Sequence, residues 1–196
     1  MATRVSFAAL LCSIAVTATH IHHPSSTPPF PFGNLSPPSP KMASTDSLQV
    51  ELSAGPENKT VACTIRNTDS EHTISFLTWD TPFDPTAVNT GILALKDAET
   101  DADIPSPGMK LNRKIPPSRD ALVEIAPKSS AERELDLSSP WIPTDGKKYQ
   151  VAVHGTWRAV WQKPANQVSD EELAALKGDE AMQGGFDSGS VEMILS

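Results

Sequence analysis

Histidine is the side chain best suited to acid–base chemistry or metal binding near neutral pH, and five histidines occur in this chain. Three of them lie in the run His20-Ile21-His22-His23, which could bind copper or zinc weakly. A strong metal site needs rigid neighbours that orient its ligands, and a proline-rich stretch follows this run. His72 and His154 stand alone, and no histidine belongs to a His-Glu-x-x-His motif. The sequence therefore predicts no metal ligand and no cofactor.

The other common catalytic motifs are also missing from the sequence. There is no Gly-x-Ser-x-Gly nucleophile turn, no Gly-x-x-x-x-Gly-Lys phosphate loop and no Cys-x-x-Cys pair. Cys12 lies in an N-terminal apolar run, so Cys63 is the one cysteine expected in the mature domain. Cys63 sits in an alternating apolar pattern and is interpreted as a small buried core residue, without a disulfide partner. We expect no catalytic residue and no enzymatic activity.

Four carboxylates alternate along one short segment, at Asp97, Glu99, Asp101 and Asp103. Alternating carboxylates can bind calcium. This spacing, however, lacks the glycine and the closing glutamate of a known calcium loop. The pattern is more typical of a solvated hairpin tip.

Two tryptophans and an arginine form the candidate binding surface. Trp157, Arg158 and Trp161 are close in sequence, and exposed indole rings could stack on sugar rings. Arg158 could add a cation–π contact. The alternative is core packing, because a tryptophan buries a large apolar area.

Charge argues against a nucleic-acid partner. The chain of 196 residues has a net charge of −8, and its densest basic stretch is Lys110, Arg113 and Lys114. That stretch is too small for a nucleic-acid footprint, which needs clustered lysine and arginine. Beyond the N-terminus no segment approaches 18 apolar residues, so we expect no membrane association after removal of that segment.

The N-terminal region predicts secretion. Arg4 precedes an apolar run, residues 5–16, that is too short to span a membrane but has the length of a signal-peptide core. Val16-Thr17-Ala18 offers small residues for cleavage. Residues 1–18 are therefore predicted as a signal peptide, 19–45 as a Pro/Ser-rich disordered linker, and 46–196 as the folded domain. An alternative is translation from Met42, which would give a cytoplasmic protein and would suit an unpaired cysteine. Asn34 and Asn58 lie in N-x-S/T sequons and are candidate glycosylation sites in a secreted chain.

The rest of the chain reads as short strands separated by turns. Apolar and polar residues alternate in Leu48-Gln49-Val50-Glu51-Leu52, which is typical of a half-buried strand. Turn residues recur at short intervals, and the eighteen prolines suit a loop-rich β protein. The expected strands lie within 48–52, 61–65, 73–79, 91–95, 109–115, 121–125, 132–137, 149–157 and 190–195. We predict an all-β, immunoglobulin-like antiparallel sandwich.

Two local signals refine this prediction. Ser169 and Glu172 have the spacing of a capping box, so one short helix should follow Ser169 and end at Gly178. Tyr149 begins a predicted strand, as does the tyrosine whose hydroxyl bonds back to the preceding chain in many immunoglobulin-like domains. We assign Tyr149 and Cys63 structural roles.

Residues 48–157 resemble the N-terminal propeptide of fungal deuterolysin-type and peptidyl-Lys zinc metalloendopeptidases. The matching runs are 61–68, 77–83, 113–115, 126–130 and 146–151, and stand-alone fungal proteins are similar in the Leu-Thr-Trp-Asp-Thr-Pro run and in the C-terminal extension. The His-Glu-x-x-His helix of those peptidases has no counterpart here. What the resemblance implies is a fold and a propeptide-like task, without hydrolysis.

Two functions follow as hypotheses. The first is a non-catalytic binding module whose partner is a protein, such as a metalloprotease that it inhibits or chaperones. The alternative is a secreted carbohydrate-binding or effector-like protein. Function must be argued from a site, and for the protein-binding hypothesis the sequence indicates no particular binding residues.

Overall fold

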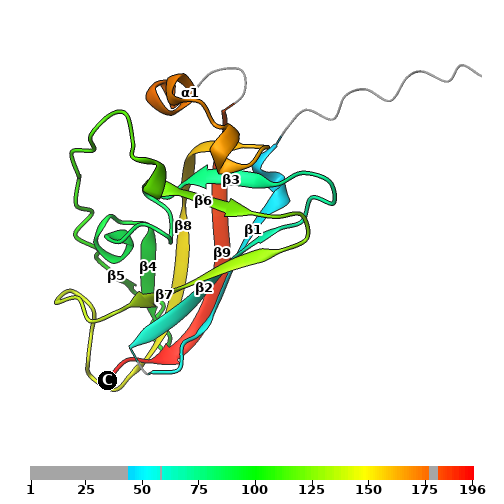
Figure 1. The fold of residues 1–196 in the computed structure, drawn as a ribbon. Coiled ribbons are helices and arrows are strands. Elements are labelled where there is room, and N and C mark those ends of the chain that lie inside the picture. The colour runs from blue at the N-terminus through cyan, green and yellow to red at the C-terminus, as the bar shows by residue number, and fades with distance from the viewer. Residues whose placement is uncertain (1–43, 58, 177–180) are drawn as a thin grey trace, which may run out of the picture. The chain divides into compact units, whose positions relative to one another are not determined.

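The computed structural model describes residues 44–57, 59–176 and 181–196 (Figure 1). The predicted signal peptide, the predicted linker up to residue 43, and the sequons at Asn34 and Asn58 lie outside the described residues. In chain order the elements are η1 (Thr45–Ser47), β1 (Leu48–Ala54), β2 (Thr60–Asn67), β3 (Ile74–Leu77), η2 (Ala87–Asn89), β4 (Leu93–Asp97), β5 (Asp103–Ile104), η3 (Arg119–Ala121), β6 (Leu122–Ile125), β7 (Ser130–Asp136), β8 (Lys148–Trp161), η4 (Ala165–Gln167), α1 (Asp170–Ala175) and β9 (Met182–Ile194).

The described strands form two antiparallel sheets. β1, β2 and β7 make the smaller sheet. The larger sheet has the order β5-β4-β8-β3-β6, and β9 pairs with β8. The predicted all-β antiparallel sandwich is confirmed, and so is the single short helix near the C-terminus within the described chain.

The buried face of each strand follows the alternation seen in the sequence. In β1, Leu48 and Val50 are buried, while the residue between them is exposed. In β2, the predicted inward residues Val61, Cys63 and Ile65 are all fully buried. Period-two burial therefore builds the core between the sheets.

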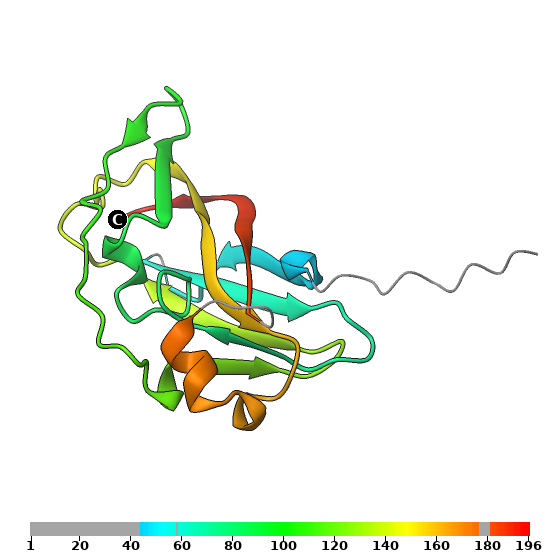
Figure 2. The same cartoon turned by 90° about the horizontal axis from the view of Figure 1, so that it is seen from above.

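Aromatic rings fill the centre of this core. The Phe76 and Trp157 ring centroids lie 5.1 Å apart in an edge-to-face arrangement, and Trp157 lies 4.8 Å from Phe186. A second, smaller cluster lies beneath α1, where Leu173 of the helix packs with Trp161 and Val168. The helix is therefore a cover for one end of the sandwich, as Figures 1 and 2 show.

The helix begins as predicted and ends earlier. The Ser169 side chain accepts the Glu172 backbone N–H, and the Glu172 side chain accepts the Ser169 backbone N–H, so the capping box is present. The last helical turn closes at Leu176, which adopts a left-handed conformation, with φ of 50°. The predicted stop at Gly178 lies outside the described residues.

Two strand predictions need correction. Residues 109–115 form no strand, because the surrounding prolines remove backbone donors and no neighbouring strand pairs with them. β9 starts at Met182, well before the predicted residue 190. Glycines in its first half interrupt the alternation of apolar and polar residues from which strands were predicted. Gly184 has a packing reason, because a Cβ there would lie 2.1 Å from Thr45 Oγ1.

Candidate functional site

The surface predicted at Trp157, Arg158 and Trp161 is not formed. Trp157 and Trp161 are 1% and 0% exposed, so neither indole can stack on a sugar, and this prediction was wrong. The reason is that β8 is a central strand, paired with β9 on one edge and with β4 and β3 on the other. Arg158 alone points outward, with half of its side chain exposed, and its guanidinium contacts the carboxylate of Asp80.

Asp80 belongs to a tightly turned loop that follows β3. Within it the Thr81 hydroxyl donates to the Thr78 carbonyl at 2.7 Å, and the Phe83 N–H donates to the Thr81 hydroxyl at 3.2 Å. The Asp84 N–H then donates to the Thr81 carbonyl at 2.9 Å. Asp80 itself has a φ of 56°, which aspartate tolerates better than most residues. These successive turns direct the carboxylate of Asp84 into the protein.

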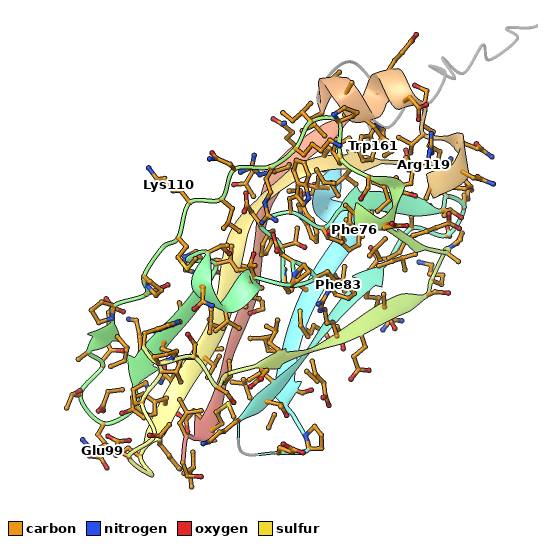
Figure 3. The ribbon with its side chains drawn as sticks, turned by 60° about the vertical axis from the view of Figure 1, so that its left-hand side comes forward. Phe76, Phe83, Glu99, Lys110, Arg119 and Trp161 are labelled. Carbon is orange, nitrogen blue, oxygen red and sulfur yellow. The ribbon has the colours of Figure 1, made fainter. Side chains whose placement is uncertain are left out.

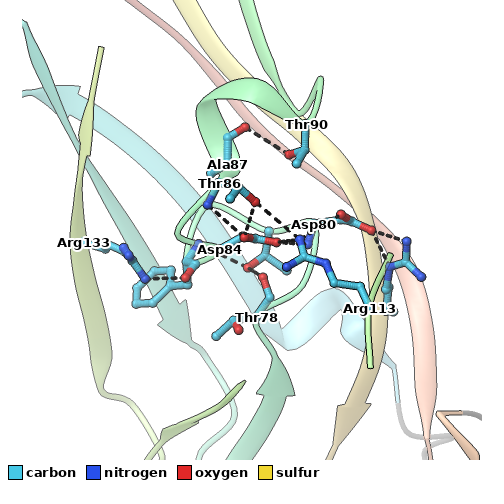
Figure 4. A network of polar contacts seen from close by, with 11 residues as sticks. Thr78, Asp80, Asp84, Thr86, Ala87, Thr90, Arg113 and Arg133 are labelled. Atoms are coloured by element: carbon cyan, nitrogen blue, oxygen red, sulfur yellow. Dashed lines mark hydrogen bonds and ion pairs between the residues drawn. The ribbon is translucent and has the colours of Figure 1, made fainter. Parts of the chain in front are cut away.

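Asp84 is a fully buried carboxylate with a complete set of donors (Figure 4). It accepts the backbone N–H groups of Asp80 and Thr86, each at 2.9 Å, and the Thr86 hydroxyl at 2.7 Å. It also accepts the guanidinium of Arg113. Burial opposes ionisation of Asp84, but the hydrogen bonds from Thr86 and Asp80 and the charge of Arg113 prevail and lower its pKa.

Arg113 reaches this carboxylate from a distant part of the chain. Its guanidinium also lies 3.4 Å from the Thr86 hydroxyl and 3.8 Å from an Asp80 oxygen. The same group sits over the Trp79 ring, 5.6 Å from the centroid. With only 19% of its side chain exposed, Arg113 is held by a carboxylate, a hydroxyl and an aromatic face together.

These contacts pin one long irregular segment, residues 105–118, here called the strap. The strap joins β5 to η3 and runs along one side of the sandwich in Figures 1 and 2. A second pin is the Met109 N–H, which donates to the Asn89 carbonyl at 2.8 Å. Loops of this length without regular structure are uncommon in compact domains and usually functional. The strap is therefore the candidate functional site.

The side chains that the strap presents are apolar and basic. Met109 and Ile115 are 50% and 61% exposed, and Ile194 is the other exposed large hydrophobic residue of the described chain. Lys110 and Lys114 are exposed beside them, and the strap contains no acidic residue. Figure 3 shows Lys110 on the outer side of this segment, away from the sheets. The strap thus holds two of the three exposed large hydrophobic side chains of the described residues, which makes it the candidate interaction surface.

Sequence reasoning found the basic residues of the strap but not the contacts that hold it. Lys110, Arg113 and Lys114 stood out only as a stretch too small to bind nucleic acid. Asp84 was not singled out, since no local pattern shows which arginine a buried aspartate meets. The available signal was a Pro-containing turn with two aspartates, Asp80 and Asp84, followed by the arginine of a basic stretch in a long loop.

The alternating carboxylates lie on the turn between β4 and β5 and are largely solvated. The Asp97 carboxylate accepts the N–H groups of Glu99 and Thr100 at 2.9 and 3.0 Å, and these bonds lower its pKa. Lys96 lies 3.5 Å from Asp101. Across the described ranges, no group of three or more His, Cys, Asp or Glu residues is placed to hold a metal ion. The run His20-Ile21-His22-His23 lies outside those ranges.

The two residues assigned structural roles lie in the core. Cys63 is fully buried and forms no disulfide, and burial raises the pKa of its thiol to about 12. The Tyr149 hydroxyl lies 3.1 Å from both carboxylate oxygens of Asp145, so it bonds back to a side chain upstream. Burial first, and then Asp145, raise the pKa of Tyr149.

Comparison with known proteins agrees with this architecture. A family model described as immunoglobulin-like domain matches residues 47–195. The chain is 35% identical over 133 residues to a protein of Arthroderma benhamiae named "Uncharacterized secreted protein", and the match covers 66% of each chain. The secretion predicted from the N-terminal pattern is confirmed by this relative. In the described part of the chain, no helix has the length and apolar character needed to span a membrane.

Proposed function

Because this chain belongs to the immunoglobulin-like domain family, we propose that it is a secreted, non-catalytic module that binds another protein through the strap. The observation that carries the proposal is that the strap exposes apolar side chains while its backbone is already held in place before a partner binds. Met109 and Ile115 are exposed, while Arg113 between them is anchored on Asp84.

Pinning matters because ordering a flexible loop on binding opposes association. Each rotamer-rich side chain that is immobilised costs about 0.5–1.5 kcal/mol, and loop ordering adds to that cost. A strap already held by Arg113 and by the Met109 N–H avoids part of the loss. Methionine and arginine are also enriched at protein interfaces.

The partner class that best fits is a zinc metallopeptidase of the deuterolysin type, which the module would inhibit or chaperone. Two of the runs that resemble the propeptides of those enzymes are 77–83 and 113–115. In the structure these two runs meet, because Arg113 contacts Asp80 and lies over Trp79. Two of the five matching runs therefore meet at the anchor of the strap, which supports a shared binding role.

The test is to titrate a purified deuterolysin-type peptidase with the secreted chain. We expect a complex on gel filtration, together with reduced peptidase activity or slower thermal inactivation. Replacing both Met109 and Ile115 by serine should weaken the complex about tenfold or more, since hot-spot side chains contribute over about 1 kcal/mol each. Ile194→Ser removes a similarly exposed side chain from another surface and should bind as the unaltered chain does.

Two outcomes would count against the proposal. If no complex forms and peptidase activity and stability are unchanged, the metallopeptidase is not the partner. If a complex forms but the Ile194 variant weakens it as much as the Met109 and Ile115 variant, the strap is not the binding surface. The carbohydrate-binding alternative keeps no supporting observation, because its two indoles are buried.

A further inference from the structure

Two oppositely charged segments follow each other directly in the chain. Residues 97–103, here called the acidic hairpin, carry four carboxylates and no basic residue. The strap follows at once, with three basic residues and no acidic one. Figure 3 places Glu99 at the tip of the hairpin and Lys110 on the strap, on the same side of the sandwich but well separated along it. One face of the domain is therefore acidic at one end and basic at the other.

The charges of the hairpin are only partly balanced within the domain. Lys96 lies 3.5 Å from Asp101 and 3.8 Å from Asp103, and the charge of Lys147 acts on Asp97, so two lysines offset part of the charge of four carboxylates. The side chains of Asp101 and Asp103 are 79% and 82% exposed, and Glu99 is exposed as well. On the strap, Arg113 is engaged with Asp84, whereas Lys110 and Lys114 are exposed. Opposite charges thus face solvent at both ends.

We propose that the strap and the acidic hairpin form a self-complementary surface through which two copies of this chain associate about a two-fold axis. A two-fold rotation exchanges the ends of a face, so the strap of one copy meets the hairpin of the other twice. Met109 and Ile115 lie beside the lysines and bury apolar area in the same contact. The partner is a second copy, because this chain itself carries the matching charges.

The association is expected to be weak and dependent on salt. Ion pairs between exposed side chains contribute little individually and are screened by salt beyond about 10 Å at 0.1 M. The dimer covers the strap, so binding of another protein there competes with self-association. This inference goes beyond the proposed function and does not depend on it.

Sedimentation equilibrium of the full secreted chain tests the dimer, at about 0.05 M and about 0.5 M sodium chloride. We expect a monomer–dimer equilibrium whose dissociation constant rises about tenfold or more at the higher salt concentration. A strap-reversed variant, Lys110→Glu with Lys114→Glu, should be monomeric. A hairpin-reversed variant, Glu99→Lys with Asp101→Lys and Asp103→Lys, leaves three lysines against Asp97 and should also be monomeric, because like charges then face each other at both contacts.

The decisive sample is an equimolar mixture of the two reversed variants. In a mixed pair, both contacts join opposite charges again, so the mixture should dimerise although neither variant does alone. The control is Arg66→Glu with Lys128→Glu, which changes net charge as the strap-reversed variant does, at exposed positions outside the strap and hairpin. This control should dimerise like the unaltered chain.

Three results would overturn the inference. They are a monomer at every concentration in low salt, a dimer that both reversed variants retain, and a mixture that stays monomeric although the unaltered chain dimerises. Each variant is first checked for an unaltered circular-dichroism spectrum. The peptidase titration tests the proposed function independently of the dimer, because it detects a complex of two different chains rather than of two copies of this chain.

Discussion

Replacing Asp84 by asparagine is expected to destabilise the domain by about 3 kcal/mol at pH 7. The substitution keeps the size of the side chain but removes the charge that Arg113 faces, and it turns one acceptor into a donor. Removing one partner from a buried ion pair typically costs about 3–5 kcal/mol, because the other charge is left uncompensated. Arg113 retains 19% exposure, which places the expected loss at the lower end.

Urea denaturation followed by tryptophan fluorescence measures this loss. Trp157 and Trp161 are buried, so their emission should shift when the domain unfolds. Asp101→Asn is the matched control, since Asp101 pairs with Lys96 at 79% side-chain exposure and should change stability by less than about 0.5 kcal/mol. Adding Arg113→Met to Asp84→Asn should recover part of the loss, because the uncompensated charge is then removed.

The pH dependence gives a second check on the same residue. The pKa of Asp84 is lowered in the folded protein, so between its folded and unfolded values the unfolded chain binds more protons. The stability that its charge contributes is therefore complete above about pH 4 and lost as pH falls through the folded value. The difference between Asp84→Asn and the unaltered chain should shrink at acidic pH. A loss below about 1 kcal/mol at pH 7, or one that does not change with pH, would refute the assigned role.

Two further predictions concern the core and the helix. The Cys63 thiol should not react with Ellman's reagent at pH 8 until denaturant is added, because it is buried with a pKa of about 12; rapid labelling of the native chain would contradict its position. Since that pKa is raised from 9.0, its contribution to stability is complete below pH 9 and is lost as pH rises towards 12. Ser169→Ala removes the helix N-cap and should cost about 1 kcal/mol, with faster hydrogen exchange in α1, whereas Ser190→Ala at an exposed position should change neither.

Much of the fold could be predicted because its signals are local. Alternation alone identified the buried residues Val61, Cys63 and Ile65 of β2. The capping box at Ser169 and Glu172 was equally readable, since both hydrogen bonds span three residues. Where glycine or proline interrupts the pattern the predictions were wrong, as in the strap and in the first half of β9.

The site was harder to predict than the fold. Trp157 and Trp161 could equally have faced solvent, because alternation shows that a strand has two faces but not whether a neighbouring layer covers each one. The anchor of the strap joins Asp84 to Arg113 across 29 residues of chain, and no sequence periodicity links them. The sequence shows that Arg113 and Arg158 are charged, but it does not show which carboxylate each of them contacts.

The sequence by itself determined the short ribbons, their inward residues and the start of the helix, because these depend on side-chain alternation and on hydrogen bonds between near neighbours. The tertiary structure alone decided that both edges of β8 are paired and that its tryptophans are enclosed. It also decided that Arg113 closes on the buried carboxylate of Asp84. Such contacts depend on how layers stack and which distant segments meet, and these are properties of the assembled sandwich rather than of any stretch of residues.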